Sequence, residues 1–100
     1  MDIRVGKVLA AERVPETDKL IKCTVDFGPG AGERTIVSGI ALFRSPESLV
    51  GKYAVYIINL APRIIRNIES QGMLLALGGV DTPFSLLVPD TEVPPGAKVK

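Results

Sequence analysis

The chain has 100 residues, 46% of them hydrophobic, which is enough for one domain with a single core over residues 1–100. The 12 Lys and Arg residues nearly balance the 11 Asp and Glu residues, so any nucleic-acid binding must come from a local group of basic side chains. The absence of His and the single Cys exclude an internal disulfide and a Cys/His zinc site. We therefore expect no metal or other cofactor.

The hydrophobic fraction is high for a small monomer that must present a polar exterior, so we expect a homodimer that buries part of the excess. The longest apolar run is far shorter than the roughly 20 residues that span a bilayer. With its lone cysteine, this indicates a cytoplasmic protein with no membrane partner.

Alternating apolar and polar residues predict two strands at the start of the chain. The apolar positions of the strand that begins at Ile3 change parity near Gly6 and Lys7, which predicts a bulge or bend there. A bent first strand can pair with two neighbours. The second strand, Ile21–Phe27, alternates cleanly and points Cys23 inward, which favours a small core residue over a reactive thiol.

The middle of the chain contains a turn, a strand and a helix. The glycines and proline of residues 28–32 predict a turn, and Thr35 to Ile40 a third strand. Ser45 is expected as the N-cap of a short helix with Pro46 in its first position, closed by Gly51.

Three more strands are expected in the second half. Lys52 to Leu60 is almost wholly apolar and should be buried on both faces, Gln71 to Leu77 follows, and Phe84 to Val88 is a short extension. The fold class is therefore all-β, a five-stranded Greek-key barrel of the oligonucleotide-binding (OB) type with one short helix and a C-terminal strand extension. The pattern alone also permits an SH3-like barrel or a small sandwich.

The segment from Asn59 to Met73 gathers polar groups directly after a buried strand, as a binding rim does. Arg63 and Arg66 are three residues apart after Pro62, and a single helical turn would place both guanidinium groups on one side. Such a pair can hold adjacent phosphates or stack on a base. Spacing alone leaves ordinary solvated arginines equally open.

Three further residues of this rim are candidates, and two of them, Asn59 and Met73, also have a structural interpretation. Asn59 either offers a donor and an acceptor to a ligand or bonds the backbone of its own turn. Ser70 offers a hydroxyl, and Met73 offers a soft surface for an unstacked base. The alternation of Met73 with Leu75 and Leu77 instead favours a place in the core.

Basic side chains extend the candidate surface across the first three strands, the usual binding face of OB domains: Arg4, Lys19, Lys22 and Arg34. Lys19 could equally form a surface ion pair of little energy with Asp18. Ser38 is a further candidate, or simply a strand end. The five aromatic residues fall mostly on core-facing or helix-packing positions, so a stacking platform for several bases is not expected.

Six short motifs occur in a fixed order: D-I-R-V-G-K-V at 2–8, proline at 15 with D-K-L at 18–20, I-V-S-G-I at 36–40, L-V-G-K at 49–52, N-L-A-P-R at 59–63 and S-Q-G-M at 70–73. Together they resemble the tRNA-binding OB domain found at the C-terminus of many methionyl-tRNA synthetases and in stand-alone dimeric tRNA-binding proteins. The resemblance covers essentially the whole chain. It implies tRNA binding by shape, in cis or in trans to the synthetase, and a homodimer in the short stand-alone forms.

Three positions depart from the pattern of this family. Val14 stands where histidine often precedes the loop proline, Ile64 where lysine is frequent, and Asn67 where glycine is common. Losing a lysine removes one phosphate contact and lowers the salt slope of binding by about one. We therefore expect weaker tRNA affinity than in relatives that keep the lysine.

A second function class is a dimeric chaperone-like or protein-binding module, since an export-related branch of the same fold shares the Pro-Arg pair at 62–63 and Leu-Gly-Gly at 77–79. An apolar exterior and the missing lysine favour it, whereas the intact S-Q-G-M motif favours tRNA. An enzyme is the third class. Without His, a metal cluster or a phosphate loop, only an unusual Ser-Lys or carboxylate pair would serve, and no spacing indicates one.

Overall fold

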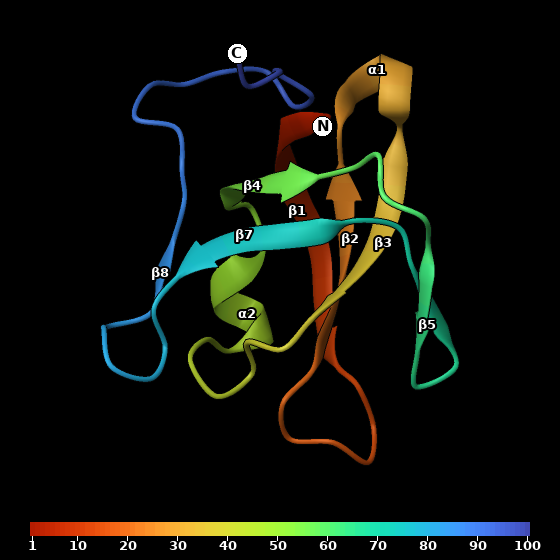
Figure 1. Ribbon diagram of the computed structural model, residues 1–100, viewed down its shortest axis with the longest axis vertical. Coiled ribbons are helices and arrows are strands. Elements are labelled where there is room, and N and C mark those ends of the chain that lie inside the picture. Colours follow the sequence, from red (N-terminus) through yellow and green to blue (C-terminus); the bar gives the residue numbers. More distant parts are fainter.

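The computed structural model describes all of residues 1–100 and shows a small β-barrel with two short helices (Figure 1). The elements are β1 Ile3–Arg13, β2 Ile21–Asp26, α1 Gly28–Ala31, β3 Glu33–Ser38, α2 Pro46–Leu49, β4 Tyr53–Ile57, β5 Arg63–Ile65, β6 Ile68–Ser70, β7 Met73–Leu77 and β8 Ser85–Leu86. The main sheet has the order β3-β2-β1-β4-β7-β8, and β5 with β6 forms a separate hairpin. This confirms the all-β, OB-like class.

Strand β1 serves two partners, as its shift of parity predicted. Its first half pairs with β4 and its second half with β2, both antiparallel. The irregularity lies between Val8 and Ala10, slightly later than expected near Gly6 and Lys7. Gly6 has a packing role instead, because a Cβ there would come within 2.7 Å of the Phe27 ring.

The core fills the barrel with apolar side chains from β1 to β4. Phe27, Ile21, Ile36 and Val25 are the largest fully buried residues, and the Phe27 and Tyr56 rings pack edge to face at 5.4 Å. The inward position of Cys23 is confirmed, since this residue belongs to the same buried cluster. The barrel closes where Gln71 N–H donates to the Thr35 carbonyl at 2.8 Å.

The helix around Pro46 forms as predicted, and a second one replaces the turn expected at residues 28–32. Ser45 caps α2 by accepting a hydrogen bond from the Ser48 N–H. Residues Gly28–Ala31 make one helical turn, α1, which closes with the Gly32 N–H donating to the Gly28 carbonyl. Neither four-residue helix is long enough to cross a membrane.

The C-terminal segment covers an open edge of β1. Val5 N–H donates to the Ala97 carbonyl, and Val99 N–H donates to the Ile3 carbonyl, each within 2.9 Å. The two ends of the chain therefore lie together at one end of the barrel (Figure 1). The predicted extension at residues 84–88 is present as the two-residue strand β8, which pairs with β7.

Two of the five aromatic side chains, Phe43 and Phe84, form a stack at the edge of the core, against which Phe84 packs. The Phe43 and Phe84 rings stack in parallel at 4.9 Å, and the Arg44 guanidinium lies over Phe84 at the same distance. The expectation that the aromatics mostly take core-facing or helix-packing positions is confirmed for the buried Phe27 and Tyr56, whereas Phe43 is exposed.

Candidate nucleic-acid interface

The segment after β4 folds as a β-hairpin, and the helical turn predicted for Arg63 and Arg66 is wrong. Arg63 pairs with Ser70, and Ile64 pairs with Glu69, so β5 and β6 are antiparallel. The two connecting residues, Arg66 and Asn67, have φ of 52° and 67°. A type I′ turn needs positive φ at both connecting residues, and its twist matches that of the two strands that it joins.

The pairing register sets which side chains share a face of the hairpin. Directly opposed residues point the same way, so Arg63 lies on one face with Ser70, and Ile64 lies on the other with Glu69. Arg66 is at the tip. Arg63 and Arg66 are both exposed and belong to neither of the two ion pairs of the molecule, which are Arg4–Asp2 and Lys22–Glu12. Their charges are therefore uncompensated by a direct partner.

Ser70 and Gln71 fasten the hairpin to the edge of β3. Ser70 Oγ accepts from the Val37 N–H at 3.0 Å and lies close enough to donate to the Gly72 carbonyl at 3.3 Å. Gln71 Oε1 accepts from the Thr35 N–H at 2.9 Å. Ser70 is only 4% exposed, so its hydroxyl orients the hairpin from inside the fold rather than facing a ligand.

A hollow of about 100 Å³ lies at the foot of the hairpin, between the hairpin and the barrel. Its lining residues are Val37, Leu60, Ala61, Arg63, Ile65, Ser70, Gly72 and Met73. Met73 is 45% exposed, so the core position favoured by its alternation with Leu75 and Leu77 is wrong. The neighbouring residue Leu74 packs against the core instead, so the inward-facing position of β7 is shifted by one residue from the prediction. The fold thus brings Met73 and Arg63 together.

Asn59 joins the start of this loop to the N-terminus rather than to its own turn. Its Oδ1 accepts from the Asp2 N–H at 2.8 Å, while Ile58 N–H donates to the Asp2 carbonyl. Arg4 Nε lies 2.9 Å from an Asp2 carboxylate oxygen. The hydrogen bond from Arg4 lowers the pKa of Asp2, so this arginine is already partnered by a carboxylate.

The remaining candidates are not on the hairpin itself. Arg34 pairs with the fully buried Val25, and its guanidinium donates to the carbonyls of Ile58 and Gln71 at 2.6 and 3.2 Å, so it closes the barrel end. Ser38 lines the barrel interior. Lys19 is exposed in the loop between β1 and β2, which points toward the same end of the molecule as the hairpin (Figure 1).

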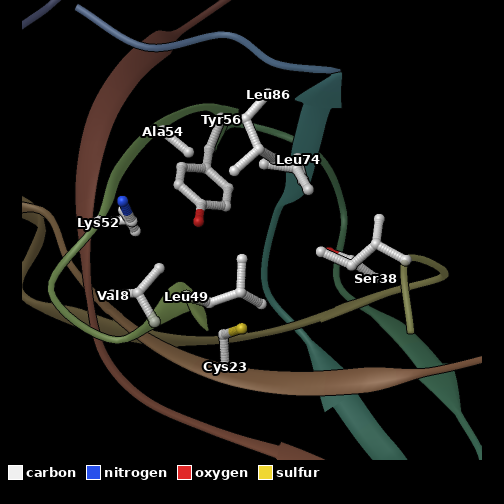
Figure 2. A pocket seen from close by; sticks show the side chains of 10 residues that line it. Val8, Cys23, Ser38, Leu49, Lys52, Ala54, Tyr56, Leu74 and Leu86 are labelled. Carbon is white, nitrogen blue, oxygen red and sulfur yellow. The ribbon is translucent and has the colours of Figure 1, made fainter. Parts of the chain in front are cut away.

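The interior of the barrel offers no room for a ligand. Its cavity has a volume of about 10 Å³, the space of one water molecule, against the 300–1,000 Å³ typical of small-molecule sites. The Tyr56 hydroxyl faces into this space, with Cys23 on the opposite wall (Figure 2). Burial raises the pKa of the Cys23 thiol to about 11, so it is protonated at neutral pH. Binding must therefore occur on the outer surface.

Sequence reasoning missed the hairpin and the residues that fasten it. A signal was present, since the β-branched Ile64 and Ile65 precede Arg66-Asn67 and another isoleucine follows. The absence of glycine after the asparagine weakens the usual turn signature. No local pattern indicates that Gln71 reaches the edge of β3, because that contact joins segments 36 residues apart.

Residues 3–98 match a family model described as "Putative tRNA binding domain". The chain is 49% identical over 100 residues to a methionine–tRNA ligase of Porphyromonas gingivalis and 50% identical over 99 residues to one of Thermotoga maritima. The chain belongs to this tRNA-binding domain family. All or nearly all of the chain aligns with each ligase but spans only 14% and 15% of its length.

Solved structures place this tRNA-binding domain among small proteins of the same fold. A MetRS-related protein from Pyrococcus horikoshii has a TM-score of 0.89 and 44% identity, covering 99% of this chain and 89% of that one. The chaperone CsaA from Bacillus anthracis has a TM-score of 0.87 and 29% identity, covering 99% and 90%. The domain is thus similar to a small part of each ligase and to nearly the whole solved chain of each of these two small proteins.

Proposed function

We propose that this domain binds tRNA without catalysis, through phosphate contacts and the shape of the RNA, at the surface formed by the β5–β6 hairpin. The observation that carries the proposal is the pair of exposed, unpaired arginines, Arg63 and Arg66, on a hairpin fastened to the barrel. Guanidinium groups suit phosphate oxygens, and structured RNA is recognised largely through its phosphates and unstacked bases. Lys19 and Asn59 extend this surface, while Ser70 and Arg34 support it from within.

The domain assists a methionyl-tRNA synthetase in this proposal, either as an appended part of it or as a separate partner in the cytoplasm. The sequence identity to methionine–tRNA ligases supports a synthetase as the partner. The similarity to a MetRS-related protein, 89% of whose solved chain is covered by this domain, supports action in trans. A weak RNA-binding module raises the local concentration of tRNA near a catalytic domain. We therefore expect a lower KM for tRNA, with kcat little changed, when the domain is supplied to its synthetase.

The direct test is a mobility-shift titration of the purified domain with unfractionated tRNA. Binding is expected at about 50 mM salt and should weaken steeply as salt rises, because phosphate contacts release counterions. Arg63→Gln should lower both the affinity and the salt slope, by about one unit for the slope. Arg44→Gln is the matched control, since Arg44 lies over Phe84, away from the hairpin. No shift at low salt would sink the proposal.

We also propose that the domain forms a homodimer. An apolar corner of exposed or half-exposed residues supports this: Leu42, Phe43, Leu77, Val80 and Phe84. The Phe43–Phe84 stack joins the two loops of this corner, and Val80 is 95% exposed. A second copy would remove these side chains from water.

Light scattering tests the dimer. The wild type should have twice the monomer mass, and the double variant Leu42→Gln with Val80→Gln should shift toward the monomer. Ile64→Gln, which removes a comparably exposed side chain from the hairpin, should remain dimeric. A monomeric wild type at working concentration would end this proposal without affecting tRNA binding.

A chaperone-like module is the second candidate function. The similarity to chaperone CsaA and the apolar corner favour it. If it is correct, the domain should suppress aggregation of an unfolded model protein, and the double variant at Leu42 and Val80 should lose that effect. Suppression without any tRNA shift would select this function over the first.

A further inference from the structure

The hollow at the hairpin foot is much larger than the site of a single water molecule. Its volume is about 100 Å³, against the roughly 10–15 Å³ that one water molecule needs on the same measure. The space is smaller than the 300–1,000 Å³ of small-molecule sites. It therefore suits a single group inserted from a larger ligand rather than a whole cofactor.

The walls of this hollow are apolar. Leu60, Ile65 and Met73 contribute aliphatic and thioether surface. Ser70 Oγ accepts from the Val37 N–H and donates to the Gly72 carbonyl, and the residue is only 4% exposed. No polar side chain except Arg63 remains to read the edge of a base, whereas the faces of every base can pack on such walls.

Arg63 gives the hollow a cationic rim. Its side chain is exposed, has no carboxylate partner and lines the hollow directly. A nucleotide carries its phosphate next to its base, so one occupant would satisfy both the apolar walls and the guanidinium. An aliphatic side chain from a protein would satisfy only the walls.

We infer that the hollow takes one unstacked base of a bound RNA, whatever its identity, while Arg63 contacts the adjacent phosphate. The inference rests on the proposed tRNA binding and adds a contact to it that phosphate binding alone does not include. It predicts a preference for RNA with unpaired nucleotides over continuous duplex.

The test fills the hollow without changing charge. Ala61 is an exposed residue of the lining, so Ala61→Leu places a larger side chain there, while Ala76→Leu adds the same side chain at an exposed alanine of β7 outside the lining. Each protein is titrated with unfractionated tRNA and with a blunt RNA duplex that has no unpaired nucleotide. Thermal melts check that each variant is folded. If Ala61→Leu is unstable, Met73→Ser replaces it, because this change removes the apolar Met73 side chain from the lining.

Ala61→Leu should bind tRNA about five-fold more weakly or worse, since stacking of a single base is worth at least that factor. Its affinity for the blunt duplex should be unchanged, and Ala76→Leu should match the wild type with both probes. Equal tRNA affinity of Ala61→Leu and wild type, or an equal loss with both RNAs, would overturn the inference while leaving tRNA binding intact. Failure of the wild type to bind tRNA would instead overturn the proposed function.

Discussion

Arg66 occupies a position of the hairpin turn that its side chain does not favour. Asparagine, aspartate and glycine are preferred where both turn residues have positive φ, and another residue in this region costs on the order of 1 kcal/mol. Asn67 meets the same requirement without strain. Asparagine in place of glycine at position 67 therefore leaves the backbone of the turn unstrained. Arg66 is the turn residue whose conformation lowers the stability of the fold.

Arg66→Asn should separate stability from binding. The asparagine fits the turn, so the free energy of unfolding should stay the same or rise by about 0.5–1 kcal/mol, as measured by urea denaturation. The tRNA affinity should fall, with a salt slope smaller by about one. Unchanged tRNA affinity would show that Arg66 is an ordinary surface residue with no part in binding.

Ile64 is 68% exposed on the face of the hairpin opposite Arg63, beside Glu69. A lysine at this position would therefore meet a carboxylate on the paired strand before it met a phosphate. The weaker affinity expected from the missing lysine remains a prediction. The structure adds that restoring the lysine alone would recover only part of the contact.

Ile64→Lys combined with Glu69→Gln should raise tRNA affinity and increase the salt slope by about one, because it adds one unpartnered cation. Ile64→Lys alone should give a smaller gain, and Glu69→Gln alone serves as the control for the lost carboxylate. Salt titrations of tRNA binding compare the three. A double variant no better than Glu69→Gln would show that position 64 does not face the RNA.

At the scale of elements, the hairpin depends on the edge of β3 for its position. Four hydrogen bonds cross this boundary, three through Gln71 and one through Ser70 Oγ. A hairpin of three-residue strands is marginal by itself. Its arginines can therefore present a fixed surface only because these bonds hold it against the barrel.

Ser70→Ala should loosen the hairpin while leaving both arginines in place. The Val37 N–H would lose its acceptor in a buried site, which costs about 1–3 kcal/mol of unfolding free energy. The Val37 amide should exchange faster with solvent in hydrogen-exchange experiments, and tRNA affinity should fall through lost preorganisation. Ser85→Ala, at an exposed serine on β8, is the matched control. Unaltered exchange at Val37 would contradict this role of Ser70.

At the scale of the whole molecule, two buried titratable groups make the free energy of unfolding depend on pH in the alkaline range. Burial raises the pKa of Cys23 from 9.0 to about 11, and it raises that of Tyr56 as well. Between pH 9 and pH 11 the Cys23 thiol of the unfolded chain releases a proton that the folded chain retains. Stability is therefore fully present below pH 9 and falls as pH rises toward 11.

The loss from Cys23 should reach about 2–3 kcal/mol of unfolding free energy near pH 11, by the conversion of roughly 1.4 kcal/mol for each unit. Urea denaturation at a series of pH values measures it. Cys23→Ala should flatten the part of the slope that begins near pH 9 and leave the contribution of Tyr56. An identical pH profile in the two proteins would contradict the buried, protonated state of this thiol.

The sequence by itself determined the elements whose signals are local. The alternation of β2, the cap of α2 at Ser45 and the apolar run of β4 each fix a backbone state through neighbouring residues, and the ordered motifs indicated the family. Local chemistry was sufficient for these features because each depends on contacts within a few residues.

Only the tertiary structure decided how the candidate surface is built. Ser70 and Arg34 resemble ligand contacts in the sequence, yet both are used inside the fold by backbone groups more than 20 residues away. The exposed parity of Met73 and the hollow beside it depend on how β7 and the hairpin meet β3. Long-range hydrogen bonds and packing set these positions, and no pattern of adjacent residues contains them.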